Sequence, residues 1–129
     1  MSRLLDGLNE AQRQAVTHVE GPLLVLAGPG SGKTRVITHR IAFMIEEGGI
    51  DPSRILALTF TNKAADEMRH RLERLVPGRS VFAGTFHRLC ARLLRRFAGQ
   101  MGLDSDFSIL DPSEVGSLVK GVMKRLDLD

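Results

Sequence analysis

The chain has 129 residues, of which 43% are hydrophobic and 26% charged, and it carries a formal net charge of +3. This composition is ordinary for a globular domain and gives no sign of disorder, and its apolar runs fall short of the ~20 residues that a membrane span needs. With one cysteine, Cys90, an intramolecular disulfide and a cysteine metal cluster are excluded, and its apolar neighbours predict a buried thiol. We expect a cytoplasmic protein without a membrane partner, because the first residues do not resemble a secretory signal.

Helix and strand patterns alternate from the N-terminus. Residues 9–19 predict a short helix with Asn9 as its N-cap. The apolar run 23–26 is typical of a strand buried on both faces of a parallel sheet. A helix is predicted over 32–47, because apolar residues recur along one face, and Gly48-Gly49 would end it.

The alternation continues through the middle of the chain. A strand is predicted at 55–60, a helix at 62–76 and a short strand near 80–83. The next predicted helix has a basic stripe made of Arg88, Arg92, Arg95 and Arg96. This stripe is either a solvated face or a surface that contacts phosphates, and the sequence leaves both open. Strands that alternate with helices of this length indicate βαβ units and an α/β fold.

The composition changes near 99–106, which is rich in Gly and Asp. A last helix is predicted to begin after Asp111, with Pro112 in its first position and Glu114 completing a capping box. Its apolar stripe over 115–126 needs another element to cover it.

A glycine-rich loop lies between the predicted strand at 23–26 and the helix that follows. It reads Ala27-Gly28-Pro29-Gly30-Ser31-Gly32-Lys33-Thr34. Glycines allow backbone N–H groups to surround a phosphate chain, a lysine reaches the β- and γ-phosphates, and a threonine hydroxyl ligates Mg²⁺. The general pattern G-x-x-x-x-G-K-[ST] has glycine where this chain has Ala27. The loop predicts binding of a nucleoside triphosphate, and the alternative is a turn whose lysine is merely solvated.

Two further motifs follow predicted strands. Leu58 to Ala65 spans the end of the strand at 55–60, and Gly84-Thr85-Phe86-His87 spans the end of the next strand. Because the carboxyl ends of parallel strands line one edge of a sheet, we expect Phe60, Thr85 and His87 at the same edge as the phosphate loop.

These segments, with the loop and Leu8–Gln12, resemble the UvrD/Rep/PcrA-like family of superfamily 1 DNA helicases. The resemblance spans essentially the whole chain, and kinases and GTPases do not share the string Thr59-Phe60-Thr61-Asn62-Lys63-Ala64-Ala65. It implies a P-loop NTPase (RecA-like) parallel sheet with flanking helices, here incomplete. Residues 1–106 would be the N-terminal part of the ATP-binding domain, and residues 107–129 would open a helical insertion subdomain.

The resemblance implies ATP and Mg²⁺ as cofactors. Gln12 would read adenine, since an amide both donates and accepts hydrogen bonds, although it could equally complete a capping box with Asn9. Lys33 and Thr34 would serve catalysis, with Thr34 as the Mg²⁺ ligand. The implied nucleotide-binding set is Gln12, Ala27, Gly28, Pro29, Gly30, Ser31, Gly32, Lys33, Thr34 and Arg35.

The resemblance also implies a set of DNA contacts, which comprises Thr59, Phe60, Asn62, Lys63, Thr85 and His87. Phe60 would stack on a base of single-stranded DNA, in a contact that tolerates any sequence. Each assignment has a structural alternative. Phe60 could be a core aromatic, Asn62 the N-cap of its helix, and His87 a structural histidine.

The implied activity is that of an ATP-dependent DNA helicase that translocates 3′ to 5′ on single-stranded DNA and acts at duplex junctions in DNA unwinding and repair. A second motor domain in the remainder of the helicase chain would be its partner. The family's strand-end Asp-Glu pair and its later arginines, which serve hydrolysis, do not occur in these 129 residues. We therefore expect binding of ATP–Mg²⁺ and DNA without hydrolysis. The alternatives are the helicase part of a recombination helicase–nuclease, a non-hydrolysing nucleotide- or DNA-binding module, and a small P-loop kinase.

Overall fold

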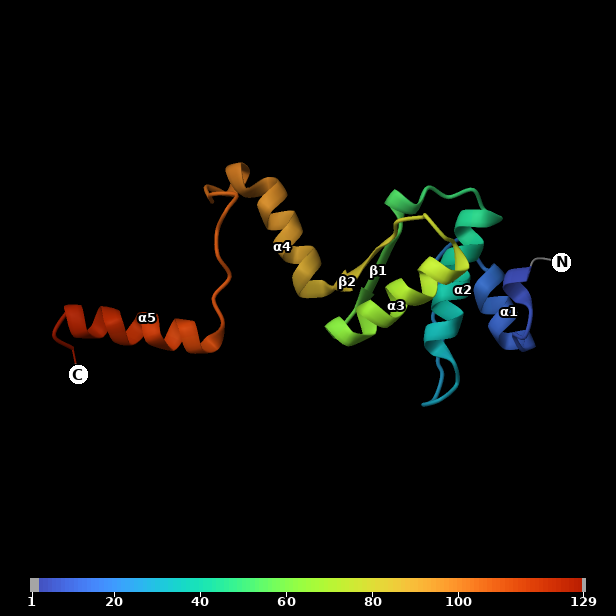
Figure 1. The fold of residues 1–129 in the computed structure, drawn as a ribbon, viewed down its shortest axis with the longest axis horizontal. Coiled ribbons are helices and arrows are strands. Elements are labelled where there is room, and N and C mark those ends of the chain that lie inside the picture. Colours follow the sequence, from blue (N-terminus) through green and yellow to red (C-terminus); the bar gives the residue numbers. More distant parts are fainter. Residues whose placement is uncertain (1–2, 129) are drawn as a thin grey trace. The chain divides into compact units, whose positions relative to one another are not determined.

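A computed structural model describes residues 3–128 of the chain (Figure 1). The chain divides between Leu89 and Cys90 into two compact units, which are described separately. The first unit contains η1 (Arg3–Leu5), α1 (Glu10–Thr17), α2 (Lys33–Glu46), η2 (Pro52–Arg54), β1 (Leu56–Thr59), α3 (Asn62–Leu75) and β2 (Phe82–Thr85). Helix α4 (Phe86–Phe97) runs from the first unit into the second, which also contains η3 (Ala98–Met101) and α5 (Pro112–Arg125). The predicted boundary between 106 and 107 stays a prediction.

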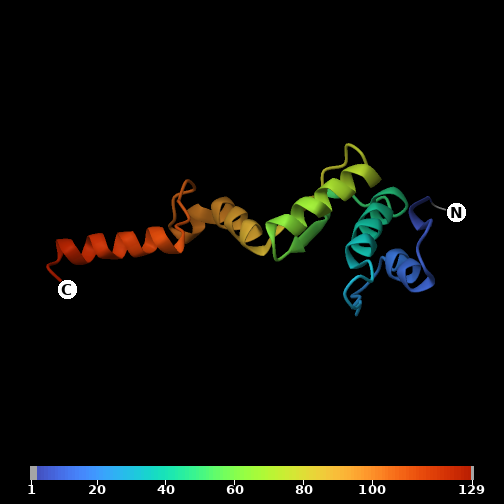
Figure 2. The same cartoon turned by 60° about the horizontal axis from the view of Figure 1, so that its bottom comes forward.

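The two strands form a parallel βαβ unit with α3. Leu56 lies opposite Phe82 and Thr59 opposite Thr85, and α3 packs along both strands (Figures 1 and 2). Ala57 and Ala83 are buried against this helix layer. The predicted α/β class is confirmed at this level. Strand β2 lies two residues later than the sequence predicted, because pairing with β1 begins at Phe82.

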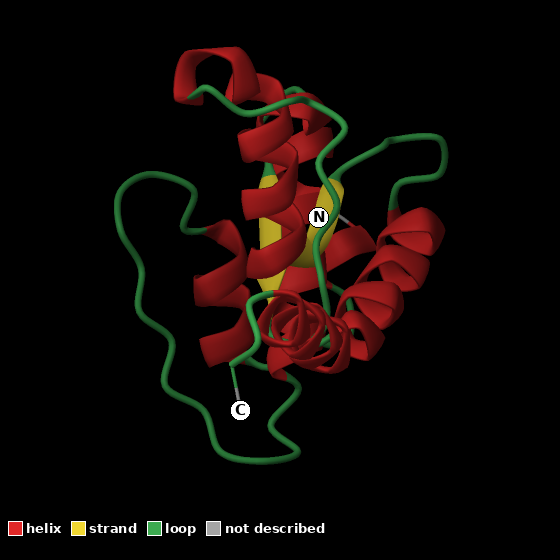
Figure 3. Ribbon diagram, turned by 90° about the vertical axis from the view of Figure 1, so that its left-hand side faces the viewer, coloured by secondary structure: helices red, strands yellow, loops and turns green. Residues whose placement is uncertain are grey.

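The strand predicted at 23–26 is absent. Yellow marks strands in Figure 3, and among the described residues only β1 and β2 are strands. Leu24 and Leu26 are 81% and 86% exposed. A strand needs backbone partners, and residues 23–26 have no strand beside them, because the sheet of the described residues consists of β1 and β2. The strand prediction is wrong for this structure, and the RecA-like sheet stays a prediction.

Two apolar clusters hold the first unit together. The larger joins η1, α2, α3 and the strands and comprises Leu4, Ile41, Ala42, Ile45, Ile55, Ala57, Met68, Leu72, Val76 and Ala83. The smaller packs α1 against α2 through Leu8, Ala15, Val16 and Val36, and Val16 is completely buried. Burial of these side chains fixes α1 relative to the start of α2, which is where the phosphate loop ends.

Two of the three candidate N-caps named from the sequence are confirmed. Asn9 and Asp111 each form the predicted capping box. Helix α3, however, is capped by Thr61, whose Oγ1 accepts the Ala64 N–H at 3.2 Å. The alternative that made Asn62 the N-cap is wrong, because Thr61 is the last extended residue and Asn62 is already helical.

The helices of the second unit have little cover within it. Helix α5 has no buried residue, and Leu118 and Val119 of its apolar stripe are 53% and 50% exposed. Cys90 is exposed, so the predicted burial of its thiol is wrong. The apolar face of α4 on which it lies has no buried residue. None of the helices within residues 3–128 combines the length and apolarity that crossing a bilayer requires.

Candidate functional site

The phosphate loop has the backbone that its glycines allow. Gly30 and Gly32 have φ angles of +73° and +83°, in the left-handed region where other residues are strained. The Ser31 hydroxyl donates to the Gly28 carbonyl at 2.6 Å and closes the turn. Helix α2 begins at Lys33, and Gly32 as N-cap offers no side chain to its first N–H groups. Such a helix start favours an anion.

Lys33 lies across the loop. Its Nζ donates to the carbonyl of Gly28 at 2.7 Å and to that of Ala27 at 3.2 Å. Both acceptors are neutral, whereas a phosphate oxygen would make a stronger, charge-assisted bond with the ammonium group. The geometry therefore permits Lys33 to exchange these carbonyls for a phosphate.

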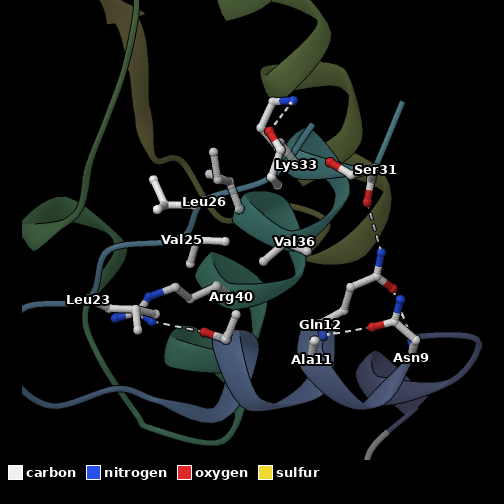
Figure 4. Close-up of a pocket in the computed structure, with 13 residues that line it drawn as sticks. Asn9, Ala11, Gln12, Leu23, Val25, Leu26, Ser31, Lys33, Val36 and Arg40 are labelled. Atoms are coloured by element: carbon white, nitrogen blue, oxygen red, sulfur yellow. Dashed lines mark hydrogen bonds between the residues drawn. The ribbon is translucent and has the colours of Figure 1, made fainter. Parts of the chain in front are cut away.

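Gln12 of α1 reaches the same loop. Its Nε2 donates to the Ser31 carbonyl at 3.1 Å, and its Oε1 accepts the Asn9 N–H at 3.1 Å (Figure 4). The Asn9 side chain in turn accepts the Gln12 N–H at 2.9 Å. The capping role of Gln12 is confirmed, and the structure adds a contact to the loop.

A cavity of about 570 Å³ opens between α1, α2 and the segment before the loop. Its lining is mainly apolar, and Figure 4 shows Leu23, Val25 and Val36 on its walls. The lining residues are Asn9, Ala11, Gln12, Ala15, Leu23, Val25, Leu26, Ala27, Ser31, Lys33, Val36, Ile37 and Arg40. Apolar walls with a few polar groups are typical of small-molecule sites.

Three lining residues of α2 were not predicted from the sequence. Val36, Ile37 and Arg40 follow Lys33 at spacings of three, four and seven residues, so they share its helix face. That spacing could have identified them. Arg40 also donates to the Ala15 carbonyl at 2.9 Å and so ties α2 to the last turn of α1.

Thr34 and Arg35 do not line this cavity. Thr34 is half-buried, and its carbonyl accepts the Thr38 hydroxyl at 2.9 Å. The Arg35 guanidinium donates to the Asp6 carbonyl at 3.4 Å. Arg35 faces a second cavity of about 310 Å³, lined also by Thr38, His39, Arg71, Arg74 and Leu75. The roles of Thr34 toward Mg²⁺ and of Arg35 toward the nucleotide stay predictions.

The ends of β1 and β2 present two exposed aromatic rings. Phe60 is 90% exposed and Phe86 is 47% exposed, and their ring centroids lie 5.5 Å apart at an interplanar angle of 38°. The alternative that made Phe60 a core aromatic is wrong. Phe86 was not predicted as part of this edge, although the pairing of Thr59 with Thr85 places it beside Phe60.

The other residues of the predicted DNA set lie on the elements that meet at this edge. Asn62 and Lys63 are exposed in the first turn of α3, and His87 is exposed in the first turn of α4. Thr85 is only 8% exposed, and its Oγ1 accepts the Arg88 N–H at 3.2 Å. Thr59 donates through its hydroxyl to the Thr61 carbonyl at 3.0 Å. The side chains of Thr59 and Thr85 are thus engaged with backbone groups at this edge of the sheet.

Acidic groups are dispersed in the part of the chain that the structure describes. No group of three or more His, Cys, Asp or Glu side chains within residues 3–128 could hold a metal ion. The one Asp-Glu dipeptide of the sequence, Asp66-Glu67, lies on α3 and pairs with Arg69 and Arg71 of the same helix. These carboxylates therefore do not follow a strand end.

The chain belongs to the UvrD/REP helicase family, since residues 8–129 match the UvrD/REP helicase N-terminal domain. Among individual relatives, the ATP-dependent DNA helicase PcrA of Staphylococcus aureus strain Mu50 and that of Staphylococcus epidermidis strain RP62A are each 47% identical to it over 131 aligned residues. The alignments cover 100% of this chain and 18% of each relative, so the chain spans about a fifth of their length.

Proposed function

We propose that these residues bind ATP–Mg²⁺ and single-stranded DNA as the N-terminal part of an ATP-dependent DNA helicase that moves 3′ to 5′. The observation that carries the proposal is the shared cavity, on which Gln12, the glycine loop and Lys33 converge. Family membership supports the activity of the whole protein, because the relatives are named as ATP-dependent DNA helicases.

The chemistry of the loop fits a triphosphate. Left-handed glycines, a helix start without a side-chain cap and one lysine favour an anion over a cation or a neutral group. Thr34 would offer its hydroxyl to Mg²⁺, whose other ligands would be phosphate oxygens and water. The apolar walls of the cavity would hold the base, with the Gln12 amide at its polar edge.

The exposed aromatic pair supports the DNA assignment. Phe60 and Phe86 offer ring faces on which bases stack, and Lys63 and His87 lie on the adjoining first turns with donors for the phosphate backbone. Stacking is indifferent to base identity, which suits a protein that moves along a strand.

We propose further that these 129 residues do not hydrolyse ATP. The strand-end acid pair that positions Mg²⁺ and the attacking water in the family has no counterpart among them, because the one Asp-Glu dipeptide, Asp66-Glu67, lies within α3 and not at the end of a strand.

The test is calorimetric titration of the chain with MgATP, together with steady-state turnover with and without single-stranded DNA. We expect binding without turnover. Lys33→Ala should weaken MgATP binding by about 10- to 100-fold, because it removes a charge-assisted contact to phosphate, and should leave DNA binding intact. Lys120→Ala, an exposed lysine on α5, is the matched control. Equal MgATP affinity in Lys33→Ala would refute the nucleotide assignment, and Lys33-dependent turnover would refute the absence of hydrolysis.

A further inference from the structure

We infer that Gln12 is a positioning residue for the phosphate loop and acts through the peptide group between Ser31 and Gly32. This inference rests on the proposed function and deepens it. The contact that carries it is the hydrogen bond of 3.1 Å from the Gln12 amide to the Ser31 carbonyl, which joins residues 19 positions apart.

The hydrogen bond fixes the orientation of one peptide plane. In a trans peptide the C=O and the following N–H point in opposite directions. Because Gln12 holds the Ser31 carbonyl on the α1 side, the Gly32 N–H is directed away from α1. Gly32 has a φ of +83°, and glycine adopts many backbone conformations, so this plane is otherwise weakly determined. Gln12 supplies the missing constraint at the residue that begins α2.

Gln12 is itself held firmly enough to act in this way. Its Oε1 and backbone N–H take part in the capping box with Asn9. Helix α1 is packed on α2 through Val16, which is completely buried, and Arg40 ties the two helices at the Ala15 carbonyl. By contrast, every residue from 21 to 31 is exposed. The loop is therefore held by hydrogen bonds and not by cover. Ser31 and Lys33 bond to the Gly28 carbonyl within the loop, and Gln12 joins the loop to α1.

The close approach of Gln12 adds to the constraint that the positive φ already places on position 32. A Cβ built there would lie 3.2 Å from Gln12 Nε2, tighter than an ordinary contact. The Gln12 amide keeps one further N–H and one further lone pair beyond these bonds. It can therefore contact a base while it holds the loop, which would link occupation of the base site to the geometry of the phosphate site.

The decisive comparison uses a ligand without a base. Magnesium tripolyphosphate and MgATP are titrated into the parent chain and into Gln12→Met, which keeps the side-chain length and removes both polar groups. Glu10→Ala is the control for the stability of α1, because it removes the acidic side chain of the first turn and its hydrogen bond from Gln14 but leaves the Gln12 amide donor in place. Gln14→Met, an exposed position on the same helix, controls for the substitution itself.

We expect Gln12→Met to weaken tripolyphosphate binding about fivefold, the effect of one hydrogen bond, while both controls stay within about twofold of the parent. In the ligand-free chain, the heteronuclear NOE of the amides of Ser31 and Gly32 should fall in Gln12→Met and in neither control variant. Gln12→Glu keeps the acceptor for the Asn9 N–H and lacks the amide donor. It should therefore lower the same NOE values, and it separates loss of the bond to Ser31 from any perturbation of α1 in Gln12→Met.

Each contrary result is distinguishable. Loss of affinity for MgATP with unchanged tripolyphosphate binding would make Gln12 a base contact only and would overturn the inference. Equal weakening in Glu10→Ala would reduce the effect to the stability of α1 and would also overturn the inference. If the parent chain bound neither ligand, the proposed function would fail, and the NOE values would still decide whether Gln12 orders the loop.

Discussion

Phe60 exposes 90% of its surface at the end of β1, beside the ring of Phe86. A ring in that position contributes little to the core, so its removal should leave the free energy of unfolding within about 0.5 kcal/mol. Phe60→Ala should instead weaken binding of single-stranded DNA by ~1–3 kcal/mol, the contribution of one stacked base. Fluorescence anisotropy with a labelled oligothymidine measures this. Phe97→Ala, a 43% exposed phenylalanine of α4, is the control, and unchanged DNA affinity in Phe60→Ala would contradict the stacking role.

Residue roles could be predicted from the sequence where they depend on local spacing. Asn9 and Gln12 are three residues apart, and their capping box follows from that interval alone. The bond from Gln12 to Ser31 and the contact of Phe60 with Phe86 join residues far apart in the chain. Such contacts depend on how elements pack, so no local pattern indicates them.

Helix α3 provides a test of the corrected cap. Thr61→Ala removes the acceptor of the Ala64 N–H and should lower the free energy of unfolding by ~1 kcal/mol, as loss of an N-cap does. Asn62→Ala should leave it unchanged or slightly higher, because alanine is the better helix former inside the first turn. Urea denaturation of both variants measures the difference. Thr61→Ser should restore the parent stability, and a larger loss in Asn62→Ala would return the cap to Asn62.

Helix α5 depends on an ionised cap. Hydrogen bonds from the Ser113 side chain, and then from the backbone N–H groups of Glu114 and Ser113, lower the pKa of Asp111 from 3.8. Since the pKa is lower in the folded state, the stabilisation is complete above pH 3.8 and is lost as the pH falls through the lowered pKa. We expect the protection of the α5 amides from exchange, measured relative to their intrinsic rates at each pH, to fall only below about pH 4. Asp111→Asn caps without titrating and should weaken this dependence, so an identical pH profile in that variant would contradict it.

The strand predicted at 23–26 shows where element-level prediction fails. Four apolar residues before a glycine loop are typical of a buried strand, but a strand forms only when other strands supply its backbone partners. Periodicity is a local property and pairing is not. The bounds of helices α2 and α3 were predicted closely, because the hydrogen bonds of a helix close within its own segment.

At the scale of the whole molecule, buried apolar surface is concentrated in the first unit. Both clusters of buried side chains lie there. Among the described residues of the second unit, α5 has no buried residue and Ala98 is the one apolar residue that is buried. The α/β class and the family were predictable, because both depend on motif order along the chain. The exposure of the apolar faces of α4 and α5 was not predictable, because it depends on which elements pack together. The chain spans 18% of the length of its relatives.

The exposed thiol of Cys90 sets a limit on covalent association. The chain has one sulfhydryl, and it lies on the surface of α4. A polypeptide of these 129 residues can therefore contribute a single sulfur to an intermolecular bridge, so its oxidation in air can yield a pair of chains and never a longer polymer. The same stoichiometry means that a maleimide dye would label every molecule at one known position, without any engineered cysteine.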